Sequence, residues 1–271
     1  MGAEWKRENR TQFDEIVEIY DKMRPEYPAG LISDILSYTH ADSGKKALEI
    51  GAGTGKATKS FLDAGYDVTA VELGANMTEF LQERFSENKN FEVINDSFEN
   101  APLKNDTYDL IYAASSFHWV DAEIGCPKAF GLLKNGGTIA MFRYHNVPAD
   151  GEKLYEDIQA VYKKHFHKPY IRPAKITKEE FAQPNGILRG FKFDDLSEYG
   201  FTDVTVRLYD VTRIFCADDY INILDTMLDH RSLPDSDRLA LYAGIKDAIL
   251  RHGGQLNMDY VFQLYMGRKC D

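Results

Sequence analysis

The chain has 271 residues, of which 44% are hydrophobic, and its formal net charge is −11. This length suffices for one α/β core with additions, and the acidic balance argues against nucleic acid as a partner, because phosphate contacts need clustered Lys and Arg. Three widely spaced cysteines without a C-x-x-C pair indicate neither disulfides nor a metal site, and no apolar run approaches the roughly 18 residues of a membrane span, so we expect a soluble, cytoplasmic protein.

The N-terminal part is expected to form two helices. Residues 11–23 carry an apolar helical face that includes Tyr20, and this helix is expected to end before Pro25, because the residue that precedes a proline avoids the α region. Residues 20–28 then read Y-x-x-x-R-P-x-Y-P, and a second apolar helical pattern begins at Leu31.

A glycine loop follows the first expected strand. Residues 47–55 read A-L-E-I-G-A-G-T-G, an apolar strand that runs into glycines whose backbone can turn tightly and lie against a ligand without Cβ atoms in the way. The helix behind this loop ends at Gly65, and a second strand over 67–71 ends in Glu72. A glycine loop followed by an acid at the end of the next strand is the layout of a site for an adenosine ribose.

The spacing of the glycines decides which adenosine ligand fits. A dinucleotide fingerprint needs a small third residue where this chain has Lys56, and no G-x-x-x-x-G-K-[ST] phosphate loop occurs. Residues 49–55 instead match E/D-x-G-x-G-x-G at every specified position, and here the chain resembles the class I S-adenosylmethionine-dependent methyltransferases. The plainer alternative is a strand-turn-helix unit that needs glycine only for its turn.

The resemblance implies an α/β fold with a Rossmann-like, seven-stranded, mostly parallel sheet in the order 3-2-1-4-5-7-6, helices on both faces, and a helical cap built from insertions. It also implies S-adenosyl-L-methionine as the cofactor. The implied cofactor-binding residues lie in the glycine loop, after the second, third and fourth strands, and on the N-terminal arm: Glu49, Gly51, Ala52, Gly53, Gly55, Glu72, Leu73, Met77, Asp96, Ser97, Phe98, Ser115, Tyr20 and Arg24.

Several of these residues have a second interpretation. In the family an acid after the third strand, here Asp96 after residues 91–94, accepts a hydrogen bond from the adenine amino group, but Asp96 also fits a turn-former. Met77 is implied to lie near the adenine, or it is a core methionine. Tyr20 and Arg24 are implied to touch the methionine carboxylate or the substrate, or they are a core residue and a surface ion pair.

The fourth expected strand, residues 108–113, leads into Ser-Ser-Phe-His-Trp over residues 115–119. In related enzymes a His-Trp pair here lies beside the donor methyl group. His118 is the tentative catalytic residue, because its ordinary pKa lies near working pH. It could equally line the site without proton transfer or cap the next helix. Trp119 would supply an aromatic wall for the substrate.

The rest of the chain is expected to complete the sheet and to cover it. A break before Pro127 is expected to start a helix over 127–133, and the fifth strand is expected over 138–142. Strands over 201–215 and 260–266 are expected to form an antiparallel pair with helices between them, and residues 167–190 fit a surface loop or lid. We expect a single domain with core residues 29–143, 193–215 and 257–269 and cap residues 1–28, 144–192 and 216–256.

The chemistry that the resemblance implies is an in-line displacement at the sulfonium methyl group, for which the protein supplies mainly alignment and water exclusion. A carboxylate acceptor needs no base, because it is already ionised near neutral pH. The guanidinium groups that could bind it are those of Arg143, Arg172, Arg213 and Arg231. A phenol, amine or carbon acceptor would benefit from a base, for which His118, His145 and Tyr144 are candidates.

We therefore expect a methyltransferase that acts on a small molecule. Residues 20–28 resemble the entry segment of trans-aconitate methyltransferase-like enzymes, so a carboxylate acceptor is one expectation, with Trp119, Arg143 and His145 as tentative substrate contacts. One alternative is a catalytically silent protein that binds S-adenosylmethionine or S-adenosylhomocysteine. A nicotinamide-dependent oxidoreductase is a second alternative, against which Lys56 argues. We expect a monomer or homodimer with no nucleic acid, membrane or metal partner.

Overall fold

The computed structural model describes residues 13–39, 45–148, 151–166 and 196–270. The expected sheet is confirmed: seven strands lie in the order β3-β2-β1-β4-β5-β7-β6. The first five strands are parallel to one another, whereas β7 is antiparallel to both β5 and β6. The strands are β1 (Lys46–Ile50), β2 (Asp67–Glu72), β3 (Phe91–Asn95), β4 (Tyr108–Ala114), β5 (Leu133–Pro148), β6 (Phe201–Cys216) and β7 (Gln255–Lys269).

Helices cover both faces of the sheet. Buried side chains of α2 and α3, such as Leu31 and Phe61, pack with residues of one face, and those of α5, such as Ala129, pack on the other. The α-helices are α1 (Val17–Met23), α2 (Ala29–Tyr38), α3 (Lys56–Asp63), α4 (Ala75–Arg84), α5 (Ala122–Leu132), α6 (Glu152–His165), α8 (Ala217–Leu224), α9 (Leu228–Arg231) and α10 (Asp235–Arg251). Short 3₁₀ turns are η3 (Phe117–Trp119) and η5 (Leu196–Tyr199).

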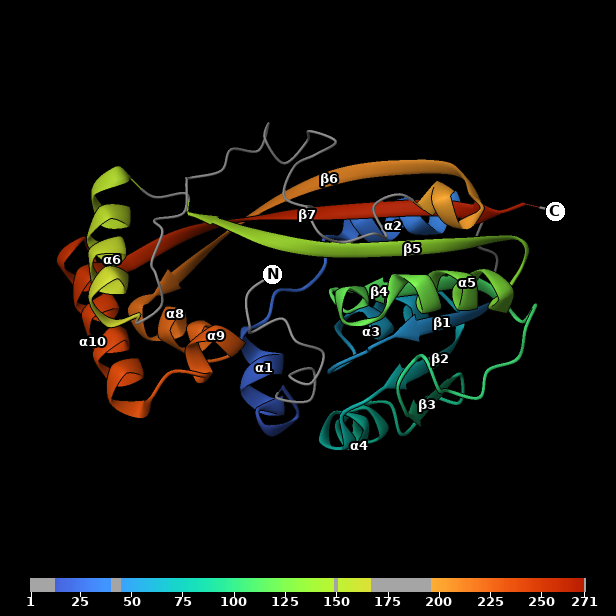
Figure 1. Cartoon of the computed structure of the whole chain (residues 1–271), viewed down its shortest axis with the longest axis horizontal. Coiled ribbons are helices and arrows are strands. Elements are labelled where there is room, and N and C mark those ends of the chain that lie inside the picture. The colour runs from blue at the N-terminus through green and yellow to red at the C-terminus, as the bar shows by residue number, and fades with distance from the viewer. Residues whose placement is uncertain (1–12, 40–44, 149–150, 167–195, 271) are drawn as a thin grey trace.

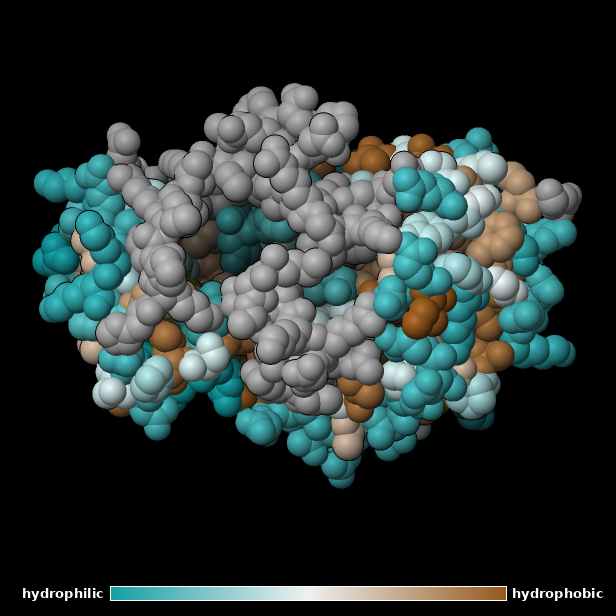
Figure 2. Space-filling view, in the orientation of Figure 1, coloured by the Kyte–Doolittle hydropathy of each residue, from teal (hydrophilic) through white to brown (hydrophobic). Residues whose placement is uncertain are grey.

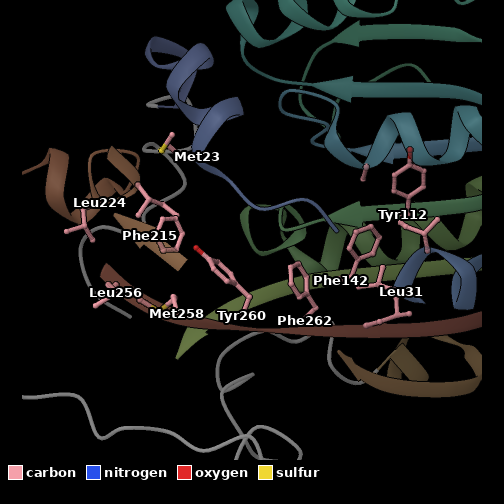
Figure 3. Packing of buried hydrophobic residues seen from close by; sticks show 14 of the residues in the cluster. Met23, Leu31, Tyr112, Phe142, Phe215, Leu224, Leu256, Met258, Tyr260 and Phe262 are labelled. Carbon is pink, nitrogen blue, oxygen red and sulfur yellow. The ribbon is translucent and has the colours of Figure 1, made fainter. Parts of the chain in front are cut away.

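The helices α6, α8, α9 and α10 gather at one end of the molecule, on the left of Figure 1, where the long strands β5, β6 and β7 also reach. Helix α1 lies between this group of helices and the half of the sheet that contains β1 to β3 (Figure 1). One apolar core joins the two regions, because large side chains follow one face of the long strands from α2 to the helices at the far end (Figure 3). They include Leu31, Phe142, Phe262, Tyr260, Phe215 and Leu224.

The fifth strand is much longer than its sequence pattern predicts. It was expected over 138–142, but β5 extends to Pro148, because each of its residues from Thr138 onward pairs with β7, ending with Pro148 opposite Met258. The residues beyond Phe142 therefore continue the sheet. This extension carries Arg143 to Asn146 past the ends of the neighbouring parallel strands.

Three helix boundaries also differ from expectation. Helix α5 begins at Ala122 and runs through Pro127 without the expected break, because the proline removes a single helical hydrogen bond while Cys126 and Ala129 stay buried on the sheet. The first helix starts at Val17 after a 3₁₀ turn. The apolar residues from Tyr220 to Leu228 have the spacing of a single helix, but they extend over both α8 and α9. The expected loop over 167–190 lies outside the described residues.

In the described parts of the chain, no helix is both long enough and apolar enough to span a bilayer. Hydrophilic side chains predominate over the described surface at the α6 and α10 end of the face shown in Figure 2, in line with the acidic composition.

Candidate active site

A cavity of about 530 Å³ lies at the C-terminal ends of β1, β2 and β4. Its floor is the glycine loop after β1, and its sides come from the residues that follow β2, β3 and β4. The N-terminal arm, residues 13–27, and the α8–α9 junction also contribute to its wall. Segments far apart in the sequence thus enclose one space, as expected for a ligand site at the carboxyl edge of an open α/β sheet.

The glycine loop adopts a conformation that other residues would strain. Gly51 and Gly53 have φ angles of 67° and 57°, in the left-handed region. A Cβ at Gly51 would lie 2.7 Å from the Cβ of Ser116, so the close approach of the β1 and β4 ends also requires glycine there. The N–H of Gly51 donates to the carbonyl of Val71 at 2.8 Å, which anchors the loop to β2.

Glu72 lies at the end of β2, as the sequence predicts, and it organises two turns. Its Oε2 accepts a hydrogen bond from the N–H of Gly53 at 2.7 Å, and its Oε1 accepts one from the N–H of Gly74 at 2.9 Å. Burial raises the pKa of this carboxyl, and the hydrogen bonds from the backbone oppose that effect. The carboxylate is therefore held in the cavity wall by the loop that it faces.

Glu49 is the other carboxyl on the floor, and it is 0% exposed. Its Oε2 accepts hydrogen bonds from Thr58 Oγ1 at 2.5 Å and from the Tyr112 hydroxyl at 2.9 Å. Its Oε1 is buried without a hydrogen-bond partner in the described structure. Burial raises the pKa of Glu49 to about 8, so this side chain is largely protonated at neutral pH while no cation is bound.

The expected adenine end of the cavity contains Met77 and Asp96. Asp96 Oδ1 accepts a hydrogen bond from the N–H of Ser97 at 2.7 Å, so it does form a turn, and its own N–H donates to the Glu72 carbonyl at 3.1 Å. The N–H of Met77 donates to Asp14 Oδ1 at 2.8 Å. Asp14 on the N-terminal arm thus caps α4 from outside, a contact that no local sequence pattern signals.

The opposite end of the cavity lies beside the end of β4. Ser115 has a φ of 57°, a conformation that is uncommon for a residue with a side chain and that active sites sometimes retain. Its N–H donates to the Phe142 carbonyl at 2.7 Å, and its Oγ accepts a hydrogen bond from the Tyr27 hydroxyl at 3.2 Å. Ser116 donates to the Ile50 carbonyl, which ties β4 to the glycine loop.

His118 and His145 line the same end as Arg143. The pKa of His118 falls to about 3, because burial disfavours the charged ring and the guanidinium groups of Arg143 and Arg24 repel it. Burial, with Arg143 and His118 nearby, lowers the pKa of His145 to about 3 as well. Both imidazoles are therefore neutral at neutral pH. A ring with so low a pKa is a poor proton acceptor, which argues against His118 as a general base.

Arg24 joins three parts of the molecule. Its Nη1 donates to the Tyr144 hydroxyl at 3.1 Å and its Nη2 donates to the Thr226 carbonyl at 2.7 Å. Its guanidinium carbon lies 4.9 Å from the centre of the Tyr20 ring. Burial raises the pKa of Tyr20 to about 12, so that phenol also stays neutral. Arg24 thus connects the N-terminal arm to β5 and to the α8–α9 junction.

The cavity brings together every predicted cofactor-binding residue except Gly55, and it also contains His118, Trp119, Arg143 and His145. Gly55 has a φ of 82° and lies behind the loop, where a Cβ would meet Phe85 at 2.6 Å and Leu81 at 2.8 Å. It serves the packing of α3 against α4 and does not line the cavity.

Two of the predicted carboxylate-binding candidates also lie elsewhere. Arg213 donates to the Met23 carbonyl at 3.0 Å, and Arg231 lies 3.6 Å from Asp225, so neither lines the cavity. Arg172 lies outside the described residues. Cavity residues that the sequence did not single out include Asp14, Tyr27, Ser116, Asn146, Met227, Leu228 and Asp229. Within the described ranges no three His, Cys, Asp or Glu side chains gather as a metal site would require.

Residues 48–141 match the protein family described as "Methyltransferase domain". An uncharacterized methyltransferase of Mycobacterium tuberculosis is 28% identical over 136 residues, which are 50% of this chain and 53% of that protein, so the chain spans about half the length of this curated relative. A protein of Saccharomyces cerevisiae named as a probable S-adenosylmethionine-dependent methyltransferase is 25% identical over 197 residues, 70% of this chain and 65% of that protein.

Among solved structures, the phosphoethanolamine N-methyltransferase 2 of Haemonchus contortus, in complex with S-adenosylhomocysteine, superposes with a TM-score of 0.56 at 15% identity, covering 100% of this chain and 61% of that one. This likeness shows the fold. The match to the family model confirms the expectation that residues 48–141 are a methyltransferase domain. It also confirms S-adenosyl-L-methionine as the expected donor.

Proposed function

We propose that this chain, whose residues 48–141 carry an S-adenosylmethionine-dependent methyltransferase domain, transfers the methyl group of the donor to a carboxylate of a small molecule. The observation that carries the proposal is the composition of the cavity beside Ser115. A buried guanidinium, Arg143, lies there with two histidines that are both neutral at neutral pH. Among the described residues, this end of the cavity offers a cation to the acceptor, and its two imidazoles are weak bases, which suits an acceptor that is already an anion.

The donor would bind along the floor of the cavity. Glu72 would bind the ribose hydroxyls, Asp96 the adenine amino group, and the backbone of Gly51 to Gly53 would lie against the methionine part. Leu73, Met77, Ser97 and Phe98 would surround the adenine, and Ala52, Glu49 and Ser115 would complete the donor site. The chemistry supplied by S-adenosylmethionine is an activated methyl group on a sulfonium centre, so the protein's task is alignment.

The acceptor would bind beyond Ser115. Arg143 is 6% exposed, and a guanidinium can pair with a carboxylate through two parallel hydrogen bonds. Trp119 would form an apolar wall, and His118 and His145 would contribute neutral ring nitrogens to hydrogen bonding. The N-terminal arm and the α8–α9 junction, which both line the cavity, would keep water from the reacting atoms. Trans-aconitate, suggested by residues 20–28, is one acid to be tested.

The first experiment is calorimetric titration of the purified protein with S-adenosylmethionine and S-adenosylhomocysteine, with a nicotinamide dinucleotide as the control. The second measures transfer of a labelled methyl group to mono-, di- and tricarboxylic acids, followed by alkaline release of methanol from the ester product. Binding of both sulfur ligands with methylation of an acid is the expected result. Binding without transfer to any small molecule would favour the alternative, a silent S-adenosylmethionine-binding protein.

Arg143→Gln provides the matched test of acceptor binding, with Arg213→Gln as the control outside the cavity. Loss of a charged partner for a carboxylate should raise the KM for the acid about 10- to 100-fold, while the affinity for S-adenosylhomocysteine stays unchanged. Equal KM values in both variants would mean that Arg143 does not bind the acceptor.

A further inference from the structure

The cavity has an apolar wall that the proposed donor site does not use. The wall consists of four side chains that all line the cavity: Phe13, Trp119, Met227 and Leu228. Each of them is half-buried, so part of its apolar surface faces the cavity. Covering such surface with a ligand removes it from water, which is favourable when the covering group is itself apolar.

Three segments that are far apart in the sequence build this wall. Phe13 comes from the N-terminal arm and Trp119 from η3, and their ring centres lie 6.2 Å apart in an edge-to-face arrangement. Met227 and Leu228 come from the α8–α9 junction, which lies beside α1 in Figure 1. The wall is therefore a feature of the folded chain that no single stretch of sequence contains.

Polar contacts join the junction to the arm. Arg24 Nη2 donates to the carbonyl of Thr226, the residue before the two junction residues of the wall, at 2.7 Å. Arg231 Nη2 lies 3.8 Å from the Oε2 of Glu15, two residues after Phe13. These contacts within the chain hold the parts of the wall together, which lowers the ordering cost of binding a ligand against it.

The wall lies next to the proposed carboxylate site. The ring centres of Trp119 and His118 are 5.0 Å apart. The pKa of His118 is lowered first by burial and then by the charges of Arg143 and Arg24, so both guanidinium groups lie within electrostatic reach of that ring. An acceptor whose carboxylate faces Arg143 would therefore place its remaining atoms beside Trp119.

A cationic group on the acceptor is disfavoured at the wall. Aromatic rings can bind an ammonium group, but a cation is already present here, because the Arg24 guanidinium carbon lies 4.9 Å from the Tyr20 ring centre and 6.0 Å from that of Phe13. The carboxylate of Asp229 lines the same cavity, but its Oδ1 accepts hydrogen bonds from the backbone N–H and the ring Nδ1 of His230. An ammonium group near the rings would be repelled by Arg24.

A second carboxylate on the acceptor is disfavoured for another reason. It would have to lie against phenyl, indole, thioether and aliphatic surfaces, and removing a charge from water against apolar atoms costs free energy. An uncharged apolar group gains contact with all four side chains of the wall without that cost.

We propose that the methyl acceptor is an amphipathic acid, whose carboxylate faces Arg143 and whose apolar body packs on Phe13, Trp119, Met227 and Leu228. By an amphipathic acid we mean a monocarboxylate with an aliphatic or aromatic body and no second charged group. This inference rests on the proposed function, and it places such monocarboxylates ahead of di- and tricarboxylates as acceptors.

The probes are straight-chain molecules of matched length. Butanoate, hexanoate and octanoate form an acid series, and butanol, hexanol and octanol form an uncharged series. Adipate and hexylamine have six carbons, as hexanoate and hexanol have, but differ from them in charge. Dissociation constants are measured on protein loaded with S-adenosylhomocysteine, so no turnover is needed. In the wild type, each added pair of methylene groups should tighten binding about tenfold, and hexanoate should bind more tightly than adipate.

Phe13→Ser and Leu228→Ser test the wall from two separate segments. Either substitution should lower the gain from each pair of methylene groups to about threefold or less. The control is Phe80→Ser, because Phe80 is also half-buried and has a guanidinium carbon, that of Arg84, 5.8 Å from its ring centre, but does not line the cavity. This control should keep the tenfold gain. Binding of S-adenosylhomocysteine shows that each variant is folded.

Three results would overturn the proposal. An equal gain in Phe13→Ser, Leu228→Ser and Phe80→Ser would mean that the chain of the probe binds away from the wall. Tighter binding of adipate than of hexanoate would place a second carboxylate there, and Arg24→Gln should then remove that preference. Tighter binding of hexylamine than of hexanol would place an ammonium group beside Asp229.

The experiment also separates this inference from the proposed function. A gain along the uncharged series that depends on the wall, without binding of acids, supports the apolar body and counts against a carboxylate acceptor. Methylation of acids with no gain along the acid series overturns the apolar body and leaves the carboxylate proposal intact. If protein that binds S-adenosylhomocysteine binds none of the probes, both proposals are wrong.

Discussion

Glu49 and Arg143 lie in one cavity, but burial leaves the Glu49 carboxyl largely neutral, whereas the Arg143 guanidinium stays charged. The Glu49 carboxyl is fully buried beside hydroxyl groups, and its raised pKa of about 8 keeps it largely neutral near pH 7. The Arg143 guanidinium keeps its charge, because an arginine is not deprotonated in proteins. Burial, and after it the charges of Arg143 and Arg24, lower the pKa of His118. The site at rest is therefore positively biased at its acceptor end, which favours an anion there.

The raised pKa of Glu49 should make the stability of the ligand-free protein depend on pH. Because the folded state holds this proton more tightly than the unfolded state, the stabilisation is fully present below about pH 4.5 and is lost as the pH rises through about 8. Urea unfolding between pH 5 and 8.5 should show this decline for the wild type and a flatter curve for Glu49→Gln. The exposed Glu79→Gln is the control and should keep the wild-type slope. Parallel curves for all three proteins would contradict the raised pKa.

Glu72 should be the main determinant of donor affinity. In Glu72→Gln the charged acceptor is lost, so S-adenosylmethionine should bind about 1.5–3 kcal/mol more weakly, the size of a hydrogen bond to a charged group. The Gly53 and Gly74 N–H groups would also lose a carboxylate partner, and the resulting loss of order in the loop would weaken donor binding further. Isothermal titration calorimetry measures the effect. Wild-type affinity in a folded variant would show that Glu72 does not bind the ribose.

At the scale of helices and strands, sequence patterns located the turns well and the lengths poorly. The glycine loop, Glu72 and Asp96 were predicted because each follows a short apolar strand within a local motif. The length of β5 could not be predicted, because its last residues are held by β7, more than a hundred residues away. Gly55 was assigned to the cofactor by its place in the motif, whereas its actual neighbour is Phe85 of the α4 end.

Gly55→Ala should therefore affect stability and not cofactor binding. The left-handed conformation and the 2.6 Å approach to Phe85 should together cost about 2–4 kcal/mol, combining backbone strain with overpacking. Gly253→Ala is the matched control, because Gly253 also has a positive φ, of 96°, but a Cβ there meets nothing within 4 Å, so only about 1 kcal/mol should be lost. Chemical unfolding gives both values. If the Gly55→Ala protein is stable but binds S-adenosylhomocysteine weakly, Gly55 does contribute to the cofactor site.

At the scale of the whole molecule, the acceptor end is assembled from contacts that span almost the entire chain. The hydrogen bond from Arg24 to the Thr226 carbonyl joins residues 202 positions apart, and the bond to Tyr144 joins residues 120 apart. The motif around Arg24 indicated a functional arginine, but no pattern near Thr226 could identify its partner, because such a contact depends on where the complete sheet places the far-end helices. Sequence analysis did not identify Asn146 and Met227 to Asp229 as cavity residues for the same reason.

Arg24→Lys should loosen both the arm and the α8–α9 junction, because one ammonium group cannot replace a guanidinium that donates to Tyr144 and Thr226 at once. Hydrogen–deuterium exchange should become faster over residues 13–27 and also over 225–231. Arg213→Lys is the control: Arg213 donates to the Met23 carbonyl of the arm, so faster exchange should stay within the arm. If exchange over 225–231 is the same in Arg24→Lys and the wild type, the junction is held by its own packing and Arg24 does not couple the arm to it.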